Sequence, residues 1–429
     1  MKHSILTLSL LCLFLLPARS QKPEMQAGIP VNYDESILGD YKATLPDPLV
    51  LNNGKKVDTP RKWTRKRRKE IVEIFEQNQF GVWPARKPPL NYSLKKDEGL
   101  GGAAVRKQLT LYFSPAGEDG PKVDVVIYLP RNSQGKSPVL LSLSFQPNSA
   151  SIYDPGLKQG MVWNNQTHER VLTDRVPKSG PNEMDSIIKR YLEAGYGFAS
   201  LCYTDITPDF EDNDELGVRG LYHTPGAPRA ADDWGSIGCW AWGISNVVDY
   251  LVTDPDIDPG RIALVGCSRL GKTALWAGAK EPRFAVVIAS CSGEGGAALS
   301  RRVYGETVAH LTTESRFPYQ FCPTYATWAN RLDEMPMDSH MLISLIAPRP
   351  LLLLTAEQDG WSDPKGEFEA AVKAGPVWEL FGKKSLEIYQ MPPVGVEVYN
   401  TLGFVMREGG HGTIPMDWDY YLDYLKKYL

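Results

Sequence analysis

The stretch RIALVGCSRLGKTALWAGAK, residues 261–280, indicates the fold class more directly than any other part of the chain. Its first half is a short apolar run that ends at Gly266-Cys267, and a helix pattern opens at Arg269. A buried strand has no need of a serine at its tip. An esterase does, because a tight strand-to-helix turn presents the hydroxyl to substrate. We therefore predict that Ser268 is a nucleophile held on such a turn.

Short apolar runs recur along the chain, with helical segments between them. Runs of this length suit strands of a parallel sheet that is buried on both faces. They are residues 138–145, 196–203, 261–267, 284–291, 350–356 and 402–409. The clearest helical segments are 234–252 and 268–280. Strands that alternate with helices predict an α/β fold with a mostly parallel, doubly wound sheet.

Other segments surround this alternating pattern. Residues 107–113 and 122–130 alternate in polarity and predict an antiparallel edge hairpin. Residues 59–81 predict a helix, and we interpret its basic run, Arg61 to Lys69, as a solvated face rather than a polyanion site. Three insertions are longer than ordinary loops, so we expect them to shape a site. They span 146–190, 204–233 and 296–345.

The N-terminus predicts export. Residues 1–20 combine a short basic start, an apolar stretch from Ile5 to Leu16 and small residues before a cleavage site after Ser20. The apolar stretch is too short for a membrane anchor, so we expect a secreted or periplasmic protein. An extended lead-in, 21–60, then precedes a single α/β-hydrolase catalytic domain, 61–429, because one such domain can use this length.

Composition limits the partners. The chain has 429 residues and a formal net charge of −4, which does not favour nucleic acid, and we expect a monomer. Five cysteines remain after the predicted cleavage, an odd number that leaves at least one thiol free. No C-x-x-C pair suggests a metal site. We expect mostly buried free thiols, with room for one disulfide that the sequence does not assign.

The order of residues along the chain supplies partners for the serine. Carboxylates follow the run 350–356, and His411 lies in a glycine-flanked loop after the run 402–409, which gives the order Ser, Asp or Glu, His of α/β-hydrolases. We predict His411 as the base and Asp359 as the acid, with Glu357 as the alternative acid. The other interpretation of Ser268 is a helix N-cap, since the second glycine of the motif stands one position late.

At family level, four segments resemble the glucuronoyl esterases, carbohydrate esterase family fifteen, particularly their bacterial members. The segments are GCSRLGKTALWAGA, DDWGSIGCWAWGISNVVDYL, SGEGG and HMLISLIAPRPLLL, and the resemblance spans about residues 190–415. It implies an α/β-hydrolase fold with three αβα layers and no cofactor or metal. It also implies hydrolysis of the ester between (4-O-methyl-)glucuronic acid of glucuronoxylan and lignin alcohols, through an acyl-enzyme on Ser268.

The resemblance also implies roles for single residues. Arg269 matches an arginine that stabilises the oxyanion, a role that a fixed cation at a helix N-terminus suits. Lys272 and Trp361 match a lysine and a tryptophan that contact the sugar. Glu306 and Glu314 match a pair that binds uronate hydroxyls in fungal members, although the first is glutamine there.

Two further positions depart from the pattern of relatives. Fungal members place the catalytic acid directly before S-G-x-G-G, where this chain has Cys291, so the acid must come from elsewhere. That favours Asp359 and leaves Glu294, inside SGEGG, to assist or to line the pocket. Some relatives link the cysteine before the serine to one after the histidine, but Gly412 follows His411 here and leaves Cys267 without that partner.

Two rival functions remain at this point. The first is another esterase or hydrolase of the same fold, such as an acetyl-xylan esterase or an acyl peptidase, because a fold does not determine its substrate. The second is a non-catalytic carbohydrate-binding protein, for which the 11 tryptophans and 20 tyrosines of the chain would supply sugar platforms.

Overall fold

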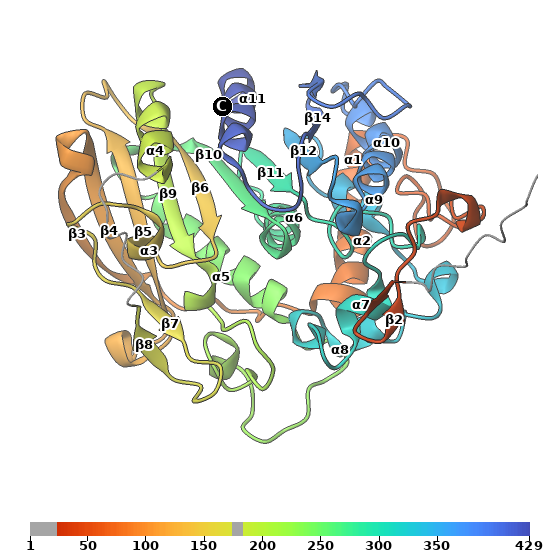
Figure 1. The fold of residues 1–429 in the computed structure, drawn as a ribbon, viewed down its shortest axis with the longest axis horizontal. Helices are drawn as coiled ribbons and strands as arrows, with labels where there is room; N and C mark the ends of the chain where they lie inside the picture. The colour runs from red at the N-terminus through yellow and green to blue at the C-terminus, as the bar shows by residue number, and fades with distance from the viewer. Residues whose placement is uncertain (1–23, 174–182) are drawn as a thin grey trace, which may run out of the picture.

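A ten-stranded sheet organises the computed structural model, which describes residues 24–173 and 183–429 (Figure 1). The predicted signal peptide, 1–20, lies outside the described residues. The strand order across the sheet is β13-β14-β12-β11-β10-β6-β9-β5-β4-β3. From β14 to β9 all neighbours are parallel, while β13 and the β3-β4-β5 side are antiparallel.

The strands of this sheet have the following bounds: β3 (Asn91–Gly99), β4 (Ala104–Tyr112), β5 (Lys122–Pro130), β6 (Ser137–Ser144), β9 (Gly197–Cys202), β10 (Ile257–Cys267), β11 (Val286–Ser290), β12 (Leu351–Ala356), β13 (Glu397–Val398) and β14 (Leu402–Arg407). Two small hairpins accompany it, β1 (Met25–Gln26) with β2 (Ile29–Pro30) and β7 (Met161–Trp163) with β8 (Arg170–Leu172). The six runs predicted as strands of a parallel sheet are therefore confirmed as β6, β9, β10, β11, β12 and β14.

Helices cover both faces of the sheet. They are α1 (Pro60–Lys62), α2 (Arg68–Phe75), α3 (Asn148–Ser151), α4 (Glu183–Glu193), α5 (Ser236–Leu251), α6 (Arg269–Lys280), α7 (Val308–Thr312), α8 (Pro323–Ala326), α9 (Ser339–Ser344), α10 (Pro364–Leu380) and α11 (Pro415–Tyr428). Side chains of α5, α6, α9 and α10 share one core cluster with one set of strand residues, and α4 and α11 share a second cluster with the alternate set. The predicted doubly wound, three-layer αβα sandwich of the α/β-hydrolase type is confirmed.

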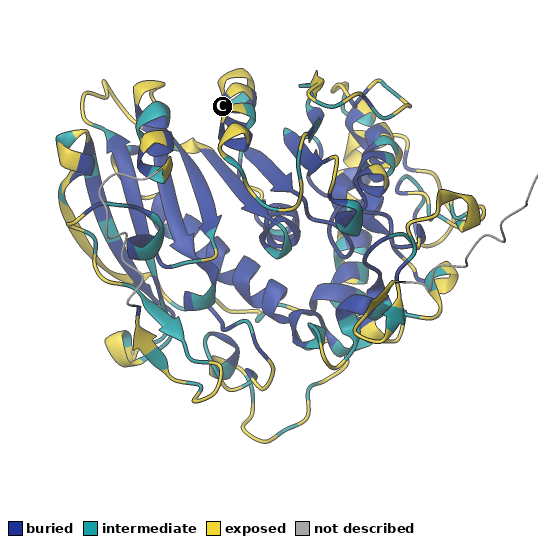
Figure 2. Ribbon diagram, viewed as in Figure 1, coloured by how far each residue is buried: buried dark blue, intermediate teal, exposed yellow. Residues whose placement is uncertain are grey.

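Burial explains the elements next to the candidate site. Every residue of α5 except Asp249 is buried, which suits a helix that is apolar on all sides and packs between the sheet and its neighbours. Apart from the edge strands β3 and β13, the sheet and the inner helix faces are mostly buried, as the dark blue of Figure 2 shows. The five cysteines of the described residues are all buried and free, which confirms the expectation of free thiols.

The predicted edge hairpin is wrong in one respect. Residues 107–113 and 122–130 do pair antiparallel within β4 and β5, but β3 continues the sheet and forms its edge. Most β3 side chains are exposed, so the strand carries no apolar alternation that the sequence could reveal. Lys95 and Lys96 on this edge discourage pairing with another chain.

The helix predicted over 59–81 extends from Pro60 to Phe80 and includes π-helical turns. Thr59 caps its first turn, and Gly81 follows at φ +85°, where a Cβ would lie 2.1 Å from the Trp234 Cα. Its basic run is only partly a solvated face. Arg67 is buried against Glu70, and the Arg68 guanidinium donates to the Ala279 carbonyl.

Contacts tie the residues predicted as an extended lead-in to the rest of the chain. The Glu35 carboxylate accepts hydrogen bonds from Arg302 and Lys365, and His340 Nε2 lies 2.7 Å from the Pro46 carbonyl oxygen. The segment therefore packs beside α7 and α10, as its red trace in Figure 1 shows. Across the described residues, no helix combines the length and the apolar character that a membrane span requires.

Candidate active site

The turn between β10 and α6 carries Ser268 in a strained backbone conformation, with φ +59° and ψ −130°. Two glycines permit the turn. A Cβ on Gly266 would lie 2.1 Å from the Leu270 carbonyl oxygen, and one on Gly271 would lie 2.8 Å from the Ser290 carbonyl oxygen. The late glycine thus stands where α6 passes close to the backbone of β11. Ser268 accordingly occupies a nucleophile elbow, and its side chain makes no N-cap hydrogen bond.

Three distant side chains meet at this turn. His411 Nε2 lies 2.9 Å from Ser268 Oγ, and His411 Nδ1 lies 2.7 Å from Asp359 Oδ2. Because a carboxylate can only accept, Nδ1 carries the proton toward Asp359, and Nε2 is left to accept from the serine hydroxyl. Ser362 Oγ, 3.2 Å from Nδ1, lies beside the same bond. The arrangement is that of a Ser-His-Asp triad.

Electrostatics support the arrangement. The hydrogen bond to Asp359 raises the pKa of His411 above its ordinary value, although burial works against this. Burial alone would raise the pKa of Asp359, but the hydrogen bonds from His411 and Ser362 outweigh it and lower that pKa. Asp359 therefore favours its ionised form, which suits the acid of a Ser-His-Asp triad.

Arg269 occupies the first position of α6, where its backbone N–H has no partner inside the helix. Its guanidinium donates to Asp209 and lies 4.7 Å from the centre of the Phe317 ring. Asp209 also accepts from the Tyr203 hydroxyl at 2.5 Å and from Gln320 Nε2 at 2.7 Å. Asp209 was not among the predicted site residues, because it lies in the insertion 204–233, where no motif marks it.

A cavity of about 210 Å³ opens beside the triad, and we call it the charged cavity. Its described lining residues are Ser268, Arg269, Lys272, Cys291, Glu306, Leu311, Arg316, Phe317, Gln320, Trp361, Ser362 and His411. The insertion 296–345 supplies five of them, as expected of a segment that shapes a site. The predicted residues Lys272, Glu306 and Trp361 all line this cavity.

Ion pairs and backbone contacts order the far wall of the charged cavity. Lys272 Nζ lies 3.8 Å from one Glu306 oxygen, and Arg316 donates to the other at 2.7 Å. Burial lowers the pKa of Lys272, and Glu306 partly offsets this. The Glu306 N–H donates to the Trp361 carbonyl, and Arg316 stacks 5.4 Å from the Trp361 ring. The cavity thus presents charged donors and acceptors next to an aromatic face.

Two of the predicted residues, Glu314 and Glu357, do not line the charged cavity. Glu314 is exposed and lies outside the lining of the charged cavity, because the loop turns Arg316, two residues later, toward Glu306. Glu357 is exposed, and its backbone N–H donates to the Arg407 carbonyl. The carboxylate that bonds to His411 Nδ1 is that of Asp359. Arg316 lies two residues after Glu314 in the same loop. The spacing between Glu306 and Glu314, on which Glu314 was predicted, gives no sign that Arg316 lines the cavity.

Glu294 is not among the described residues that line the charged cavity, and its partners lie elsewhere. Its carboxylate accepts from Ser300 Oγ at 2.6 Å and from the Tyr325 hydroxyl at 2.9 Å, and burial raises its pKa to about 8. A second buried acid, Glu367, accepts from the Gly293 N–H at 2.6 Å, and burial likewise raises its pKa to about 8. Together these two side chains fix the loop SGEGG against the site.

Cys291 stands beside the triad at the end of β11. Its thiol packs with Cys267 and Ala356 in a small buried cluster. Among the described residues, Cys291, Asp359 and His411 form the one trio whose ligand atoms could hold a metal ion, since these atoms lie within 4.8 Å of one another. A bound ion there would compete with the hydrogen bond between His411 and Asp359.

Comparison with known proteins places this geometry in a family. The model of a family described as "Glucuronyl esterase, fungi" matches residues 221–382. A carbohydrate esterase of an unknown prokaryotic organism is 40% identical over 405 residues, covering 92% of this chain and 91% of the relative. The chain belongs to the glucuronoyl esterase family. The predictions of family and enzyme class, a carboxylic ester hydrolase, are confirmed.

Solved members of the family have the same fold. A glucuronoyl esterase from Solibacter usitatus is 41% identical with a TM-score of 0.83, over 89% of this chain and 97% of that one. A promiscuous esterase of carbohydrate esterase family fifteen, from a marine bacterial metagenome, is 38% identical with a TM-score of 0.82, over 93% of this chain and all of that one. The fungal 4-O-methyl-glucuronoyl methylesterase 1 of Wolfiporia cocos is 26% identical, over 79% of this chain and 72% of its own length. This glucuronoyl esterase family member is therefore of the bacterial type.

Proposed function

We propose that the protein is a serine esterase that cleaves the ester between (4-O-methyl-)glucuronic acid of glucuronoxylan and alcohols of lignin. The observation that carries the proposal is the hydrogen-bonded series Ser268, His411 and Asp359 at the mouth of a charged cavity. Such a cavity suits a uronate, whose hydroxyls need donors and acceptors and whose ring packs on an aromatic face.

In the mechanism, Ser268 Oγ attacks the ester carbonyl while His411 Nε2 takes its proton. The negative charge that develops on the carbonyl oxygen is stabilised by the Arg269 N–H and guanidinium, and Asp359 stabilises the imidazolium. His411 then gives the proton to the departing alcohol oxygen, which leaves a uronyl ester on Ser268. Water, deprotonated by the same histidine, hydrolyses this ester and frees the uronic acid.

Substrate contacts follow from the lining of the charged cavity. Lys272 and Glu306 offer a donor and an acceptor to sugar hydroxyls, and Trp361 offers its ring face. Arg316 adds a second cation to the wall and pairs with Glu306, the residue that was predicted to act together with Glu314. Four wall side chains of this kind favour a uronate over an acetyl group, which has no hydroxyls to bind.

Export, domain organisation and oligomeric state concern the whole chain. We propose an exported protein, secreted or periplasmic after cleavage behind Ser20, whose lead-in 21–60 precedes one catalytic domain, 61–429. It would act as a monomer on glucuronoxylan-lignin esters, without nucleic acid or a membrane anchor. N-terminal sequencing of the exported protein and its mass in solution test these points.

The deciding experiment compares methyl glucuronate with methyl galacturonate and acetylated xylan. We expect the glucuronate ester to be hydrolysed fastest and Ser268→Ala to lose turnover by about 10⁶-fold while still binding glucuronate, since it removes the covalent step and leaves the cavity. Ser186→Ala, an exposed serine on α4, is the matched control and should retain full activity. Faster release of acetate than of methanol would reject the uronate assignment.

A further inference from the structure

Three metal-ligating groups of different kinds meet at the catalytic histidine, and we call them the trio. The Cys291 sulfur, an Asp359 oxygen and a His411 nitrogen all lie within 4.8 Å of one another. The three residues follow β11, β12 and β14, which are neighbours in the sheet. Within residues 24–173 and 183–429, no other cysteine, histidine and acidic side chains converge in this way. The esterase mechanism uses the imidazole and the carboxylate but gives the thiol no part.

The backbone holds the thiol of Cys291 in this place. Cys291 has φ +43°, in the left-handed region that residues other than glycine rarely adopt, and its N–H donates to the Leu354 carbonyl at 2.8 Å. Such a conformation costs free energy and persists only where the surroundings fix it. The residue is 1% exposed, yet it lines the charged cavity together with His411. The sulfur is therefore fixed beside the imidazole and within reach of an ion in the cavity.

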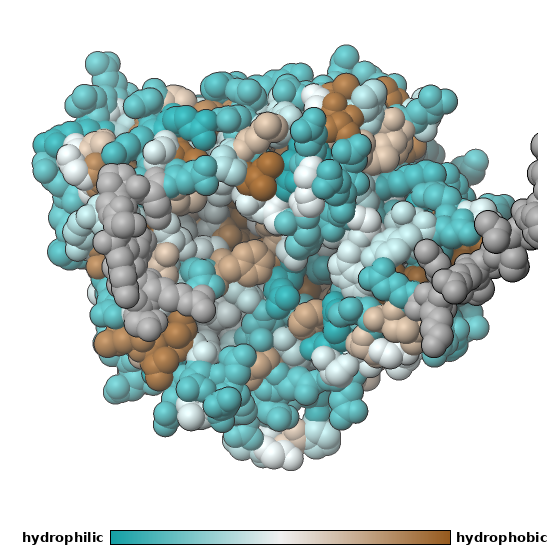
Figure 3. Space-filling model, viewed as in Figure 1, coloured by the Kyte–Doolittle hydropathy of each residue, from teal (hydrophilic) through white to brown (hydrophobic). Residues whose placement is uncertain are grey.

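The charged cavity gives an ion a path to the trio. The His411 side chain is 44% exposed at the cavity. The face viewed in Figure 3 is hollowed near its centre, and the atoms around the hollow are mostly hydrophilic. The cations of the cavity wall are each paired with a carboxylate, which limits their repulsion of a further cation. The pairs are Arg269 with Asp209, and Lys272 and Arg316 with Glu306.

The donor set selects the ion. Sulfur and imidazole nitrogen are ligands that Zn²⁺ prefers, whereas Mg²⁺ and Ca²⁺ take oxygen ligands. A tetrahedral Zn²⁺ binds sulfur at about 2.3 Å and nitrogen and oxygen at about 2.0–2.2 Å, which places its ligand atoms roughly 3.3–3.8 Å apart. Small side-chain rotations bring the trio to this spacing, since His411 Nδ1 and Asp359 Oδ2 start 2.7 Å apart. Water completes the fourth position.

We infer that Cys291, Asp359 and His411 bind Zn²⁺ and that the bound ion switches the esterase off. Binding is a property of the three side chains, whereas the loss of activity rests on the proposed function. The thiol proton passes to solvent when the ion binds, because a coordinating thiol is deprotonated. The imidazole keeps its one proton, which occupies the nitrogen that the ion leaves free.

Either nitrogen that the ion takes removes the catalytic base. With Zn²⁺ on Nδ1, the proton is on Nε2, 2.9 Å from Ser268 Oγ, and this nitrogen then donates instead of accepting the serine proton. With Zn²⁺ on Nε2, the lone pair that accepts this proton is taken by the ion. Uronate contacts in the charged cavity use Lys272, Glu306 and Trp361, which the ion does not bind. Zn²⁺ should therefore lower kcat rather than raise KM.

The direct test uses Co²⁺, which substitutes for Zn²⁺ in such sites and gives a near-ultraviolet charge-transfer absorption when a thiolate binds it. The purified protein is stripped with EDTA and titrated with Co²⁺. We expect the thiolate band to appear with one equivalent in wild type and to be absent in Cys291→Ala. Cys239→Ala removes a buried thiol on α5 and is the matched control, in which the band should be retained.

The second measurement follows hydrolysis of methyl glucuronate as Zn²⁺ is added, with each variant compared with its own rate in EDTA. We expect Zn²⁺ to lower kcat in wild type and Cys239→Ala, EDTA to restore it and Mg²⁺ to have no effect. Cys291→Ala should need about 100-fold more Zn²⁺ for the same loss, because one of the three ligands is gone.

Three outcomes would overturn the inference: no thiolate band in wild type, a band that persists in Cys291→Ala, or a band without a loss of kcat. Should Cys291→Ala not fold, Cys291→Ser keeps nearly the same volume with a much weaker ligand, and both measurements are repeated on it. A wild-type protein that hydrolyses no glucuronate ester would reject the proposed function, while the Co²⁺ band would still decide whether the trio binds metal.

Discussion

The ends of β11 and β12 lie side by side in the sheet, and both reach the catalytic histidine, but they carry different groups. At the end of β11 stands Cys291, a thiol with φ +43° whose N–H donates to the Leu354 carbonyl. Beyond the end of β12 stands Asp359, whose carboxylate accepts from His411. Both groups lie near the same imidazole, since ligand atoms of Cys291, Asp359 and His411 all lie within 4.8 Å of one another. The comparison shows that geometry, rather than position in the chain, identifies the acid.

The largest expected effect comes from removing the carboxylate that follows β12. Asp359→Asn should lower kcat by about 10⁴-fold, because an amide favours the wrong histidine tautomer and does not stabilise the imidazolium. Glu357→Gln, two residues earlier and exposed, should keep kcat within about twofold of wild type and serves as the matched control. Steady-state hydrolysis of methyl glucuronate measures both. A large loss in Glu357→Gln with little in Asp359→Asn would reverse the assignment of the acid.

A smaller loss is expected at Asp209, which accepts a hydrogen bond from Arg269, the arginine that we propose to stabilise the oxyanion. Asp209→Asn should lower kcat by about 10- to 100-fold with little change in KM, since it loosens one oxyanion donor rather than removing it. Asp214→Asn, in the same insertion and paired with Arg219, is the control and should leave kcat unchanged.

A double-mutant cycle separates positioning from general damage at Asp209. If Asp209 acts through Arg269, the loss in Asp209→Asn should nearly vanish when Arg269→Ala is already present. Losses in kcat that multiply in the double variant would contradict a positioning role.

The comparison is sharpened by moving the carboxylate from one strand end to the other. Cys291→Glu, introduced into Asp359→Asn, should recover about tenfold in kcat, because a carboxylate at the end of β11 can approach His411 Nδ1. Cys291→Gln in the same background has the same size without the charge and should recover nothing. Equal rates for the two double variants would show that the end of β11 cannot orient the histidine in this chain.

The pH dependence follows from the same hydrogen bond. Only neutral His411 accepts the serine proton, so kcat/KM falls as pH drops through the pKa of His411. Asp359 raises that pKa, and its loss in Asp359→Asn lowers it. The acid limb of the pH profile should therefore move to lower pH in the residual activity of this variant. An acid limb that stays in place, or moves to higher pH, would argue against Asp359 as the partner.

Much of this molecule could be predicted from its sequence, for identifiable reasons. The parallel strands are apolar on both faces, so each is a continuous apolar run in the sequence. Glycine and proline residues near the ends of these runs mark where the strands stop. Ser268, His411 and Asp359 each follow such a run, and the fixed order of strands in the fold brings their ends together. β3 escaped prediction because its exposed side chains follow no apolar pattern.

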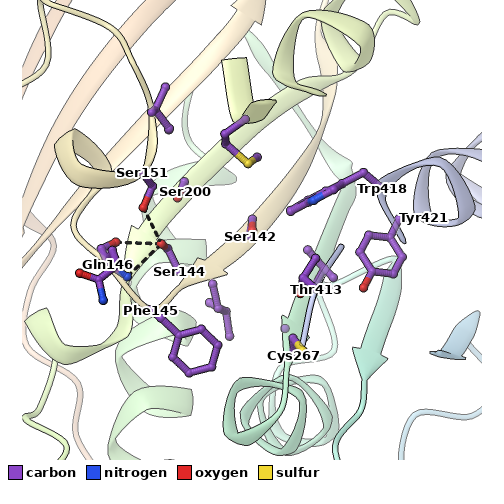
Figure 4. A pocket seen from close by; sticks show the side chains of 15 residues that line it. Ser142, Ser144, Phe145, Gln146, Ser151, Ser200, Cys267, Thr413, Trp418 and Tyr421 are labelled. Carbon is purple, nitrogen blue, oxygen red and sulfur yellow. Dashed lines mark hydrogen bonds between the residues drawn. The ribbon is translucent and has the colours of Figure 1, made fainter. Parts of the chain in front are cut away.

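The substrate side was less accessible to sequence reasoning. Asp209 and Arg316 come from long insertions, where tertiary contacts rather than local periodicity set the direction of each side chain. A spacing match selected Glu314, but the loop that contains it turns at Arg316, and the match carries no information about that turn. A second cavity, of about 290 Å³, is assembled from the ends of β6, β9 and β10 and from side chains of α3, α4 and α11, and none of these segments is distinctive alone (Figure 4).

The smallest expected effect returns to the end of β11. If Cys291 only fills space, Cys291→Ser should keep kcat/KM within about twofold while placing a hydroxyl among Cys267 and Ala356 at a cost of about 1 kcal/mol. The melting temperature should fall by about 1 °C, and Cys239→Ser, a buried thiol on α5 away from the triad, should show a similar fall with full activity. A loss of activity in Cys291→Ser that Cys239→Ser does not share would instead place the thiol in the chemistry. The two strand ends would then act together on the histidine rather than one in place of the other.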